Sequence, residues 1–316
     1  MTPKFAITFA GQGSQAIGMM SGFTGAASTV IKHTFEEASA TIKTDLWDMI
    51  VNGPTDVLAQ TVNTQPLMLT AAIATFRAWQ QAGGRAADFY AGHSLGEYSA
   101  LVAAGAIAFA DAVPLVRFRA EAMQDAVPDG MGGIAAILGL EAEVIREICR
   151  EAAQGEVLEA VNLNSPGQIV IAGHKAAVER GMALAKMQGA KRALLLPMSV
   201  PSHCALMKPA AEKLAQYLQS VSVKLPAMPV IQNADVMAFA DTVAIKQALV
   251  EQLYRPVRWI ETIQYLATHG ATHIVECVPG KILTGLNKRI DATLNCFAIT
   301  DSASLETALV HAGAGI

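Results

Sequence analysis

The sequence predicts an α/β protein in which a smaller domain interrupts a larger one. A short apolar segment at 89–91 runs directly into Gly92-His93-Ser94-Leu95-Gly96 and a helix-forming stretch, which is typical of a strand, a tight turn and a helix. Between 128 and 199 the segments follow the order strand, helix, strand, strand, helix, strand. A chain of 316 residues is long enough to form two domains.

The first part of the chain is expected to alternate strands with helices. Proline suits the start of a helix and glycine commonly follows its end, so we expect Pro66 to open a long helix and Gly83 to end it. Asp111 is expected to cap another helix, because its side chain can accept a hydrogen bond from a free N–H of the first turn. The expected segments are strand 4–10, helix 30–40, helix 64–83, strand 89–91, helix 95–104 and helix 111–127.

The segments between 128 and 199 match a ferredoxin-like module. The expected segments are strand 133–140, helix 141–153, strands 157–163 and 168–172, helix 175–188 and strand 193–198. Asn164-Ser165-Pro166-Gly167 suits the hairpin turn between the middle strands. We therefore expect a larger domain formed by 1–127 and 200–316, with 128–199 inserted as the smaller domain.

The remainder of the chain is also expected to alternate helices with strands. The expected segments are helix 206–220, strand 229–233, helices 241–254 and 257–270, strand 273–278 and a helix opened by Pro279-Gly280-Lys281.

The composition argues against several classes of protein. A formal charge of −4 disfavours a nucleic-acid partner, since such proteins usually carry a basic excess. The four cysteines form no C-x-x-C pair, so we expect no disulfide framework, no metal site and a reducing, cytoplasmic location. Glutamines and glycines interrupt the uncharged stretch 5–31, so no signal peptide, membrane span or membrane partner is expected.

Ser94 is the first candidate catalytic residue. Glycines on both sides let the backbone turn sharply and place the serine Oγ at the tip of the turn. The helix that follows directs its free N–H groups at developing negative charge. This pattern indicates acyl transfer through a nucleophilic serine.

A second glycine-rich segment, Gly11-Gln12-Gly13, follows the first predicted strand and resembles the start of a dinucleotide-binding loop. The acidic pair Glu36-Glu37, which would have to reach a ribose, instead falls in a segment with helical spacing. Dinucleotide binding is therefore disfavoured.

Arg119 and His203 are the other two catalytic candidates. Helical spacing places Arg119 on the apolar face of its helix with no carboxylate three or four residues away, so its partner is either a distant acid or a ligand. His203 is expected near a helix N-terminus, where the positive end of the dipole favours the neutral imidazole that a general base requires.

In combination these motifs resemble the malonyl-CoA:acyl-carrier-protein transacylases of bacterial type II fatty acid synthesis. The motifs that carry the resemblance are Phe9-Ala10-Gly11-Gln12-Gly13-Ser14-Gln15, Thr64-Gln65-Pro66, Gly92-His93-Ser94-Leu95-Gly96-Glu97-Tyr98, Arg119, Asn162-Leu163-Asn164-Ser165-Pro166-Gly167-Gln168, Ser199-Val200-Pro201-Ser202-His203-Cys204 and Pro279-Gly280-Lys281. The resemblance implies an α/β-hydrolase-like large domain with an inserted ferredoxin-like small domain, and a site in the cleft between them.

The resemblance also implies a ping-pong reaction without a cofactor. Malonyl would pass from CoA to Ser94 and then to the phosphopantetheine thiol of acyl carrier protein, with His203 as the base. An imidazole with the ordinary pKa of about 6.5 can take up and return the proton. The backbone N–H groups of Gln12 and Leu95 would stabilise the oxyanion, and Arg119 would bind the free malonyl carboxylate.

Further roles follow from the same resemblance. Backbone carbonyls around 254–256 are expected to orient the histidine. The remaining matched positions are Gln65, His93 and Asn162 as cleft-lining residues and Gln168 and Arg192 as CoA contacts. Acyl carrier protein is acidic, so a local basic patch from Lys191, Arg192, Lys281, Lys288 and Arg289 is expected to bind it.

Three alternatives to this reading stay open. Leu95 after the serine favours malonyl, whereas Ser202 before the histidine favours methylmalonyl, the choice of some acyltransferases of polyketide assembly. A serine esterase or thioesterase could use the same turn with water as the second nucleophile, although Arg119 argues against it. A scaffold that binds acyl carrier protein without catalysis is the remaining alternative.

Overall fold

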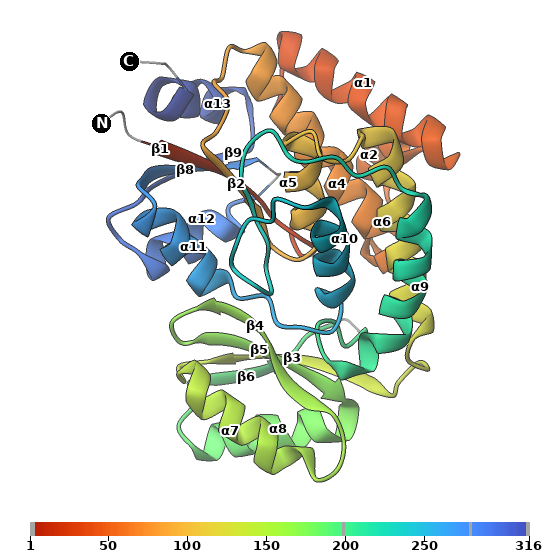
Figure 1. Cartoon of the computed structure of the whole chain (residues 1–316), viewed down its shortest axis with the longest axis vertical. Coiled ribbons are helices and arrows are strands. Elements are labelled where there is room, and N and C mark those ends of the chain that lie inside the picture. Colours follow the sequence, from red (N-terminus) through yellow and green to blue (C-terminus); the bar gives the residue numbers. More distant parts are fainter. Residues whose placement is uncertain (1–3, 198–199, 278–279, 314–316) are drawn as a thin grey trace.

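The larger part of the protein is built on a parallel sheet. The computed structural model describes residues 4–197, 200–277 and 280–313, and in it five strands follow the order β7-β2-β1-β8-β9 (Figure 1). These strands are β1 (Lys4–Phe9), β2 (Phe89–Gly92), β7 (Val230–Ile231), β8 (Ala271–Cys277) and β9 (Asn295–Ile299). Phe9 pairs with Gly92, so the carboxyl ends of β1 and β2 lie side by side. Ligands of parallel sheets usually bind at this edge.

Helices surround this sheet (Figure 1). They are α1 (Gly25–Ile42), α2 (Leu46–Asn52), α3 (Thr55–Ala59), α4 (Thr61–Gln81), α5 (Gly96–Ala103), α6 (Phe109–Asp125), η1 (Ala205–Met207), α9 (Lys208–Ser220), α10 (Thr242–Glu251), α11 (Trp259–Thr268), α12 (Ile282–Ile290), α13 (Ser302–Ala308) and the π-helical turn η2 (Leu309–Gly313). The described residues contain no helix with the length and apolarity needed to cross a membrane.

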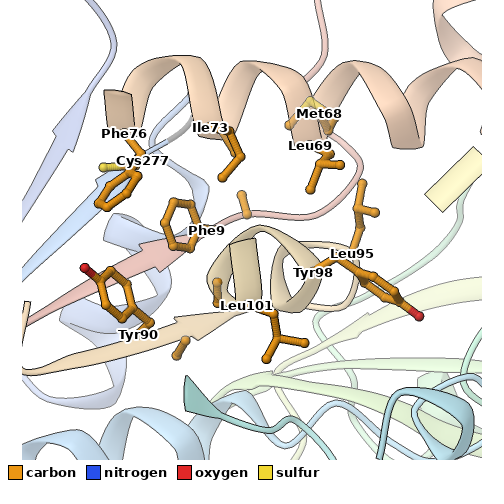
Figure 2. Packing of buried hydrophobic residues seen from close by; sticks show 14 of the residues in the cluster. Phe9, Met68, Leu69, Ile73, Phe76, Tyr90, Leu95, Tyr98, Leu101 and Cys277 are labelled. Atoms are coloured by element: carbon orange, nitrogen blue, oxygen red, sulfur yellow. The ribbon is translucent and has the colours of Figure 1, made fainter. Parts of the chain in front are cut away.

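An aromatic cluster packs α4 against the central strands (Figure 2). The ring of Phe9 on β1 lies 6.1 Å from that of Phe76 on α4 and 6.4 Å from that of Tyr90 on β2. All three side chains are buried, and each buried aromatic side chain stabilises the fold by about 1.5–3 kcal/mol. Leu95 and Leu101, which flank and occupy α5, join the same core. The turn between β2 and α5 is therefore supported by closely packed core residues.

Some element boundaries differ from the prediction. Pro66 lies inside α4 rather than at its start, because the helix already begins at Thr61. The missing N–H of proline removes the helical hydrogen bond to the carbonyl of Val62. Asp111 is not an N-cap: α6 begins at Phe109 with Ala108 as its N-cap, which places Asp111 in the first turn near the positive end of the helix dipole.

The smaller sheet has four antiparallel strands in the order β4-β5-β3-β6. Its elements are β3 (Gly132–Leu138), α7 (Ala142–Ala153), β4 (Leu158–Ser165), β5 (Gln168–His174), α8 (Lys175–Met187) and β6 (Arg192–Leu195). This order and connectivity are those of a ferredoxin-like fold, as predicted. The protein is thus an α/β protein that combines a parallel sheet with a small antiparallel one.

The two faces of the small sheet have different neighbours. Ile169 and Ile171 of β5 pack in one core with α7 and α8, whereas Val170 and Ala172 pack in another with Cys204 of the larger part. Because all six elements fall between 132 and 195, we propose 128–199 as the inserted domain and 1–127 with 200–316 as the larger one. The predicted strand end at Met198, the motif residue Ser199, the strand end at Val278 and the helix-opening Pro279 lie outside the described residues.

Candidate active site

Ser94 occupies the sharp turn between β2 and α5. Its φ of 53° lies in the left-handed region, which a non-glycine residue adopts at an energetic cost. A Cβ atom on Gly92 would come within 1.9 Å of the backbone of Gly96, and one on Gly96 within 2.0 Å of the carbonyl oxygen of Phe9. The two glycines are therefore required by the close approach of strand, turn and helix.

His203 lies directly against the serine. Its Nε2 is 2.7 Å from Ser94 Oγ, and its Nδ1 is 2.7 Å from the carbonyl oxygen of Gln252. A carbonyl can only accept, so Nδ1 carries the proton and Nε2 is left to accept the serine hydroxyl. The nearest acceptor is thus Gln252, just before the predicted 254–256, because α10 ends at Glu251 and leaves this carbonyl free. The carbonyl of Arg255, inside the predicted range, also favours the protonated ring.

The neutral imidazole has a different cause from the one predicted. Burial and, second, the positive charge of Arg119 lower the pKa of His203 to about 3, against the opposing effect of the Gln252 carbonyl. A helical segment does follow His203, first η1 from Ala205 and then α9 from Lys208, but burial and the charge of Arg119 are the main causes of the low pKa. The free protein therefore does not keep the ordinary histidine pKa that the sequence led us to expect.

A cavity of about 180 Å³ opens above the Ser94–His203 pair, between the two sheets. Its walls come from the β1 loop, the Ser94 turn, the small sheet, the His203 segment and α12. The lining residues are Ala10, Gly11, Gln12, His93, Ser94, Ile134, Asn162, Asn164, Gln168, Val170, Leu196, Ser202, His203, Ile282, Leu283 and Leu286. A reacting group in this cavity would meet both the serine and the loop after β1.

Two backbone N–H groups are candidates to bind an oxyanion: that of Gln12, which lines the cavity, and that of Leu95, which follows Ser94 in the chain. Within the described chain, no group accepts a hydrogen bond from the N–H of Gln12 or Leu95. The N–H of Ser94 itself is taken, because it donates to Oδ1 of Asn233 at 2.7 Å. The two free N–H groups are the ones predicted to face the oxyanion.

Arg119 is buried, with 1% of its surface exposed. Nη1 donates to Oε1 of Gln65 at 2.8 Å, Nη2 donates to Oε1 of Gln252 at 2.9 Å, and the guanidinium lies 5.4 Å from the ring centre of Tyr98. Its Nε has no acceptor among the described residues, and no carboxylate there forms an ion pair with it. Two of the five N–H donors are thus used by neutral oxygens, and the charge has no anionic partner among the described residues. Arg119 is not among the residues that line the cavity and lies behind its wall, against Gln65 and Gln252.

Glu97 is the carboxyl group that acts electrostatically on Arg119, and it is fully buried. Burial raises the pKa of Glu97 to about 8, whereas the N–H of Asn233 and the charge of Arg119 act in the opposite direction. Glu97 Oε2 accepts the Asn233 N–H at 2.7 Å. This carboxyl group is therefore held by the main chain and does not chelate the guanidinium.

The other predicted site residues divide into two groups. His93 and Asn162 line the cavity, and His93 Nε2 lies 2.8 Å from Oδ1 of Asn164 on the small sheet. Burial is the main cause that lowers the pKa of His93. Gln65 is fully buried and lies beneath Gln12, where it holds Arg119, and does not line the cavity.

The residues predicted to contact CoA and the carrier protein lie partly in the cavity and partly on the surface. Gln168 lines the cavity, whereas Arg192 lies exposed on β6 and is not part of its wall. The remaining basic residues predicted to form a patch, Lys191, Lys281, Lys288 and Arg289, are also exposed.

Sequence reasoning missed Gln252 and Asn233. Gln252 contacts all three candidates: its carbonyl binds His203, its Oε1 binds Arg119, and its Nε2 donates to the carbonyl oxygen of Ser94 at 2.9 Å. Asn233 is the last residue of the predicted strand 229–233, and its position at a carboxyl strand end was a usable signal. Gln252 stands at a helix end and carries no such signal.

Comparisons with known proteins agree with this geometry. Residues 7–290 match the model of the acyl transferase domain family. The malonyl CoA-acyl carrier protein transacylase of Salmonella typhimurium is 53% identical over 308 residues, covering 98% of this chain and 99% of that protein. The Bacillus subtilis protein of the same name is 45% identical over 307 residues, covering 97% and 96%.

Solved structures match over almost the whole chain. An acyl-carrier-protein S-malonyltransferase from Burkholderia pseudomallei has a TM-score of 0.95 at 55% identity, covering 97% of this chain and 99% of that one. A malonyl-transacylase in complex with its type II PKS acyl-carrier protein has a TM-score of 0.95 at 50% identity, covering 97% and 99%. The chain therefore belongs to the malonyl CoA-acyl carrier protein transacylase family.

Proposed function

We propose that this protein transfers malonyl from malonyl-CoA to the phosphopantetheine thiol of acyl carrier protein, through a malonyl ester on Ser94. The observation that carries the proposal is a serine in hydrogen-bond contact with a neutral histidine, beside a buried arginine without a carboxylate partner among the described residues. The named activity of relatives at 53% and 45% identity supports the choice of substrates.

The first half-reaction forms the acyl-serine. Ser94 Oγ attacks the thioester carbonyl while His203 Nε2 takes up the hydroxyl proton, and the N–H groups of Gln12 and Leu95 stabilise the oxyanion by about 3 kcal/mol each. The carbon–sulfur bond then breaks, and the imidazolium returns its proton to the departing CoA sulfur. The Gln252 carbonyl stabilises the imidazolium at its other nitrogen.

The malonyl carboxylate is assigned to Arg119. Its remaining N–H donors can form charge-assisted bonds to a carboxylate, and an acyl group without one leaves a buried cation unpaired. The charge of Arg119 is also the second cause of the low pKa of His203, so a bound carboxylate raises that pKa. Substrate binding thereby makes the imidazole a stronger base when proton transfer is needed.

The second half-reaction runs the same steps in reverse with a different thiol. His203 removes the proton of the phosphopantetheine thiol, the sulfur attacks the ester carbonyl, and Ser94 leaves with the proton returned by the histidine. The exposed residues Lys191, Arg192 and Lys288 are proposed to attract the acidic carrier protein.

One assay distinguishes transfer of malonyl to the carrier-protein thiol from hydrolysis of malonyl-CoA. The purified protein is mixed with malonyl-CoA and holo acyl carrier protein, and malonyl carrier protein and free malonate are measured over time, with acetyl-CoA and methylmalonyl-CoA in parallel. We expect transfer to exceed hydrolysis, malonyl to be preferred, and the covalent malonyl adduct to disappear in Ser94→Ala. Dominant release of malonate would establish a thioesterase instead, and faster transfer of methylmalonyl would reassign the acyl group.

We also propose a cytoplasmic location. Cys149, Cys204, Cys277 and Cys296 are all buried free thiols, a state that a reducing compartment preserves. Cell fractionation should recover the protein with cytoplasmic markers, and recovery in a secreted fraction would contradict the assignment.

A further inference from the structure

Asn233 is a buried residue whose polar groups are all engaged around the serine turn. Its Oδ1 accepts the N–H of Ser94 at 2.7 Å, and its Nδ2 donates to the carbonyl oxygen of Gly92 at 2.5 Å. Its own N–H donates to Oε2 of Glu97 at 2.7 Å, and its carbonyl accepts the N–H of Arg258 at 3.2 Å. One side chain thus bridges the turn from the Gly92 carbonyl to the N–H of the strained residue Ser94.

The orientation of this amide is determined by its neighbours. The backbone N–H of Ser94 can only donate and the carbonyl of Gly92 can only accept, so oxygen and nitrogen of the Asn233 side chain have a single arrangement that satisfies both. An aspartate of the same shape could still accept from Ser94, but it would bring an oxygen against the Gly92 carbonyl. The site therefore requires the amide.

The contact also determines which N–H groups near the nucleophile are free to donate. Because Asn233 occupies the N–H of Ser94, this group is not available to an oxyanion, while those of Gln12 and Leu95 stay free among the described residues. The same contact holds Ser94 at its φ of 53°, the conformation in which its Oγ reaches His203. Without it, relaxation of the turn would move both the nucleophile and the donors.

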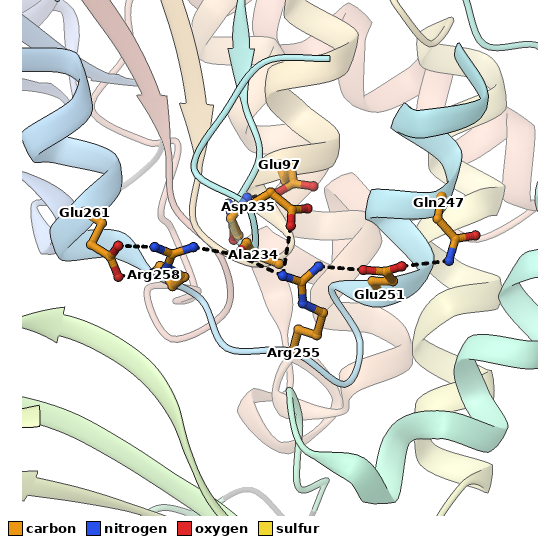
Figure 3. A network of polar contacts seen from close by, with 9 residues as sticks. Glu97, Ala234, Asp235, Gln247, Glu251, Arg255, Arg258 and Glu261 are labelled. Atoms are coloured by element: carbon orange, nitrogen blue, oxygen red, sulfur yellow. Dashed lines mark hydrogen bonds and ion pairs between the residues drawn. The ribbon is translucent and has the colours of Figure 1, made fainter. Parts of the chain in front are cut away.

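The loop that carries Asn233 is itself held from outside. Arg258 donates to the carbonyl oxygen of Ala234 at 3.1 Å, and Arg255 reaches the same oxygen at 3.4 Å and forms an ion pair with Asp235 at 2.8 Å (Figure 3). Val236 in this loop has a φ of 55°, which is unusual for a β-branched residue. A strained loop held by several contacts is typical of a segment that positions a functional group.

We propose that Asn233 is a positioning residue for the nucleophile, acting through the Ser94 main chain and held in place by Glu97. The inference rests on the proposed function only in taking Ser94 as the nucleophile. Its test therefore needs a probe of serine reactivity that does not involve malonyl.

The probe is phenylmethylsulfonyl fluoride, from which the serine oxygen displaces fluoride to form a sulfonate ester. The rate constant of labelling is measured by intact mass for the wild-type protein, Asn233→Ala and Asn233→Asp, and malonyl transfer is measured in parallel. Asn63→Ala is the matched control, because Asn63 also donates a side-chain hydrogen bond, to the carbonyl oxygen of Val57 at 3.0 Å, but outside the cavity wall. Circular dichroism melting verifies that each variant is folded.

Both Asn233 variants should label at least about tenfold more slowly, since small displacements of a nucleophile have effects of this size, and Asn63→Ala should match the wild type. In malonyl transfer kcat should fall while KM for malonyl-CoA changes less than about twofold. A folded Asn233→Ala that labels at the wild-type rate would overturn the inference, and where this variant does not fold, the isosteric Asn233→Asp decides by the same criterion. A wild-type protein that labels but transfers no malonyl would instead refute the proposed function.

Discussion

The low pKa of His203 makes Ser94 reactive in acidic solution. An imidazole with the ordinary pKa of 6.5 is about 76% neutral at pH 7 but only about 3% neutral at pH 5, which predicts a fall of about 25-fold in serine reactivity. With the pKa of His203 lowered to about 3, the ring stays neutral across this range and the rate of Ser94 labelling should change by less than about twofold. The sign follows from burial, which disfavours the charged form.

The assay is the pH dependence of sulfonyl fluoride labelling, because this reagent carries no titrating group. Labelling is followed from pH 4.5 to 8 by intact mass, with circular dichroism verifying the fold at each pH. Arg119→Gln removes the second cause of the low pKa of His203, so labelling of this variant should begin to slow at a higher pH than in the wild type, toward the acid end of the measured range. Arg117→Gln, at a half-exposed position of the same helix, should label like the wild type at every pH. A limb with its midpoint near 6.5 in the wild-type protein would refute the argument that burial keeps His203 neutral.

Three further predictions concern binding, the turn and a helix. Arg119→Ala should lower kcat/KM for malonyl-CoA by about a hundredfold relative to acetyl-CoA, which corresponds to about 3 kcal/mol. Steady-state kinetics with both thioesters measures this preference, with Arg117→Ala as the control. A malonyl preference that persists in Arg119→Ala would contradict the assignment of the carboxylate to Arg119. Gly92→Ala should not give a stable fold, because its Cβ would lie 1.9 Å from backbone atoms; an unchanged Tm would disprove this. Gly285→Ala, with open space at its Cβ on α12, should raise stability by about 0.5–1 kcal/mol, and a lower Tm would show that the helix surface is contacted.

The serine turn and the inserted domain were predictable because their signals are local. Three spaced residues specify the turn, and six segments in order specify the ferredoxin-like unit. Arg119 was found because the period of its helix places a charge on an apolar face, and the structure does bury it. What was missed depends on contacts between distant segments.

Asn233 and Gln252 belong to that second class. The hydrogen bonds that join them to Ser94 span 139 and 158 positions of the chain, and only the strand order β7-β2-β1 brings the first of them together. The neutral oxygens that hold Arg119 were equally invisible, since a buried cation predicts a partner but not its identity. The reason for the neutral His203 was also misjudged, because burial cannot be read from a helix start.

The connection between α10 and α11 links the inserted domain to His203. Val257 accepts a backbone hydrogen bond from Leu163 at 2.9 Å and donates one to Val161 at 2.8 Å, so this connection is joined to β4. Five residues earlier in the chain lies the carbonyl that holds His203. A movement of the inserted domain would therefore also shift the carbonyl that orients the imidazole. The contact between His203 and Ser94 thus depends on a fixed relative orientation of the two domains.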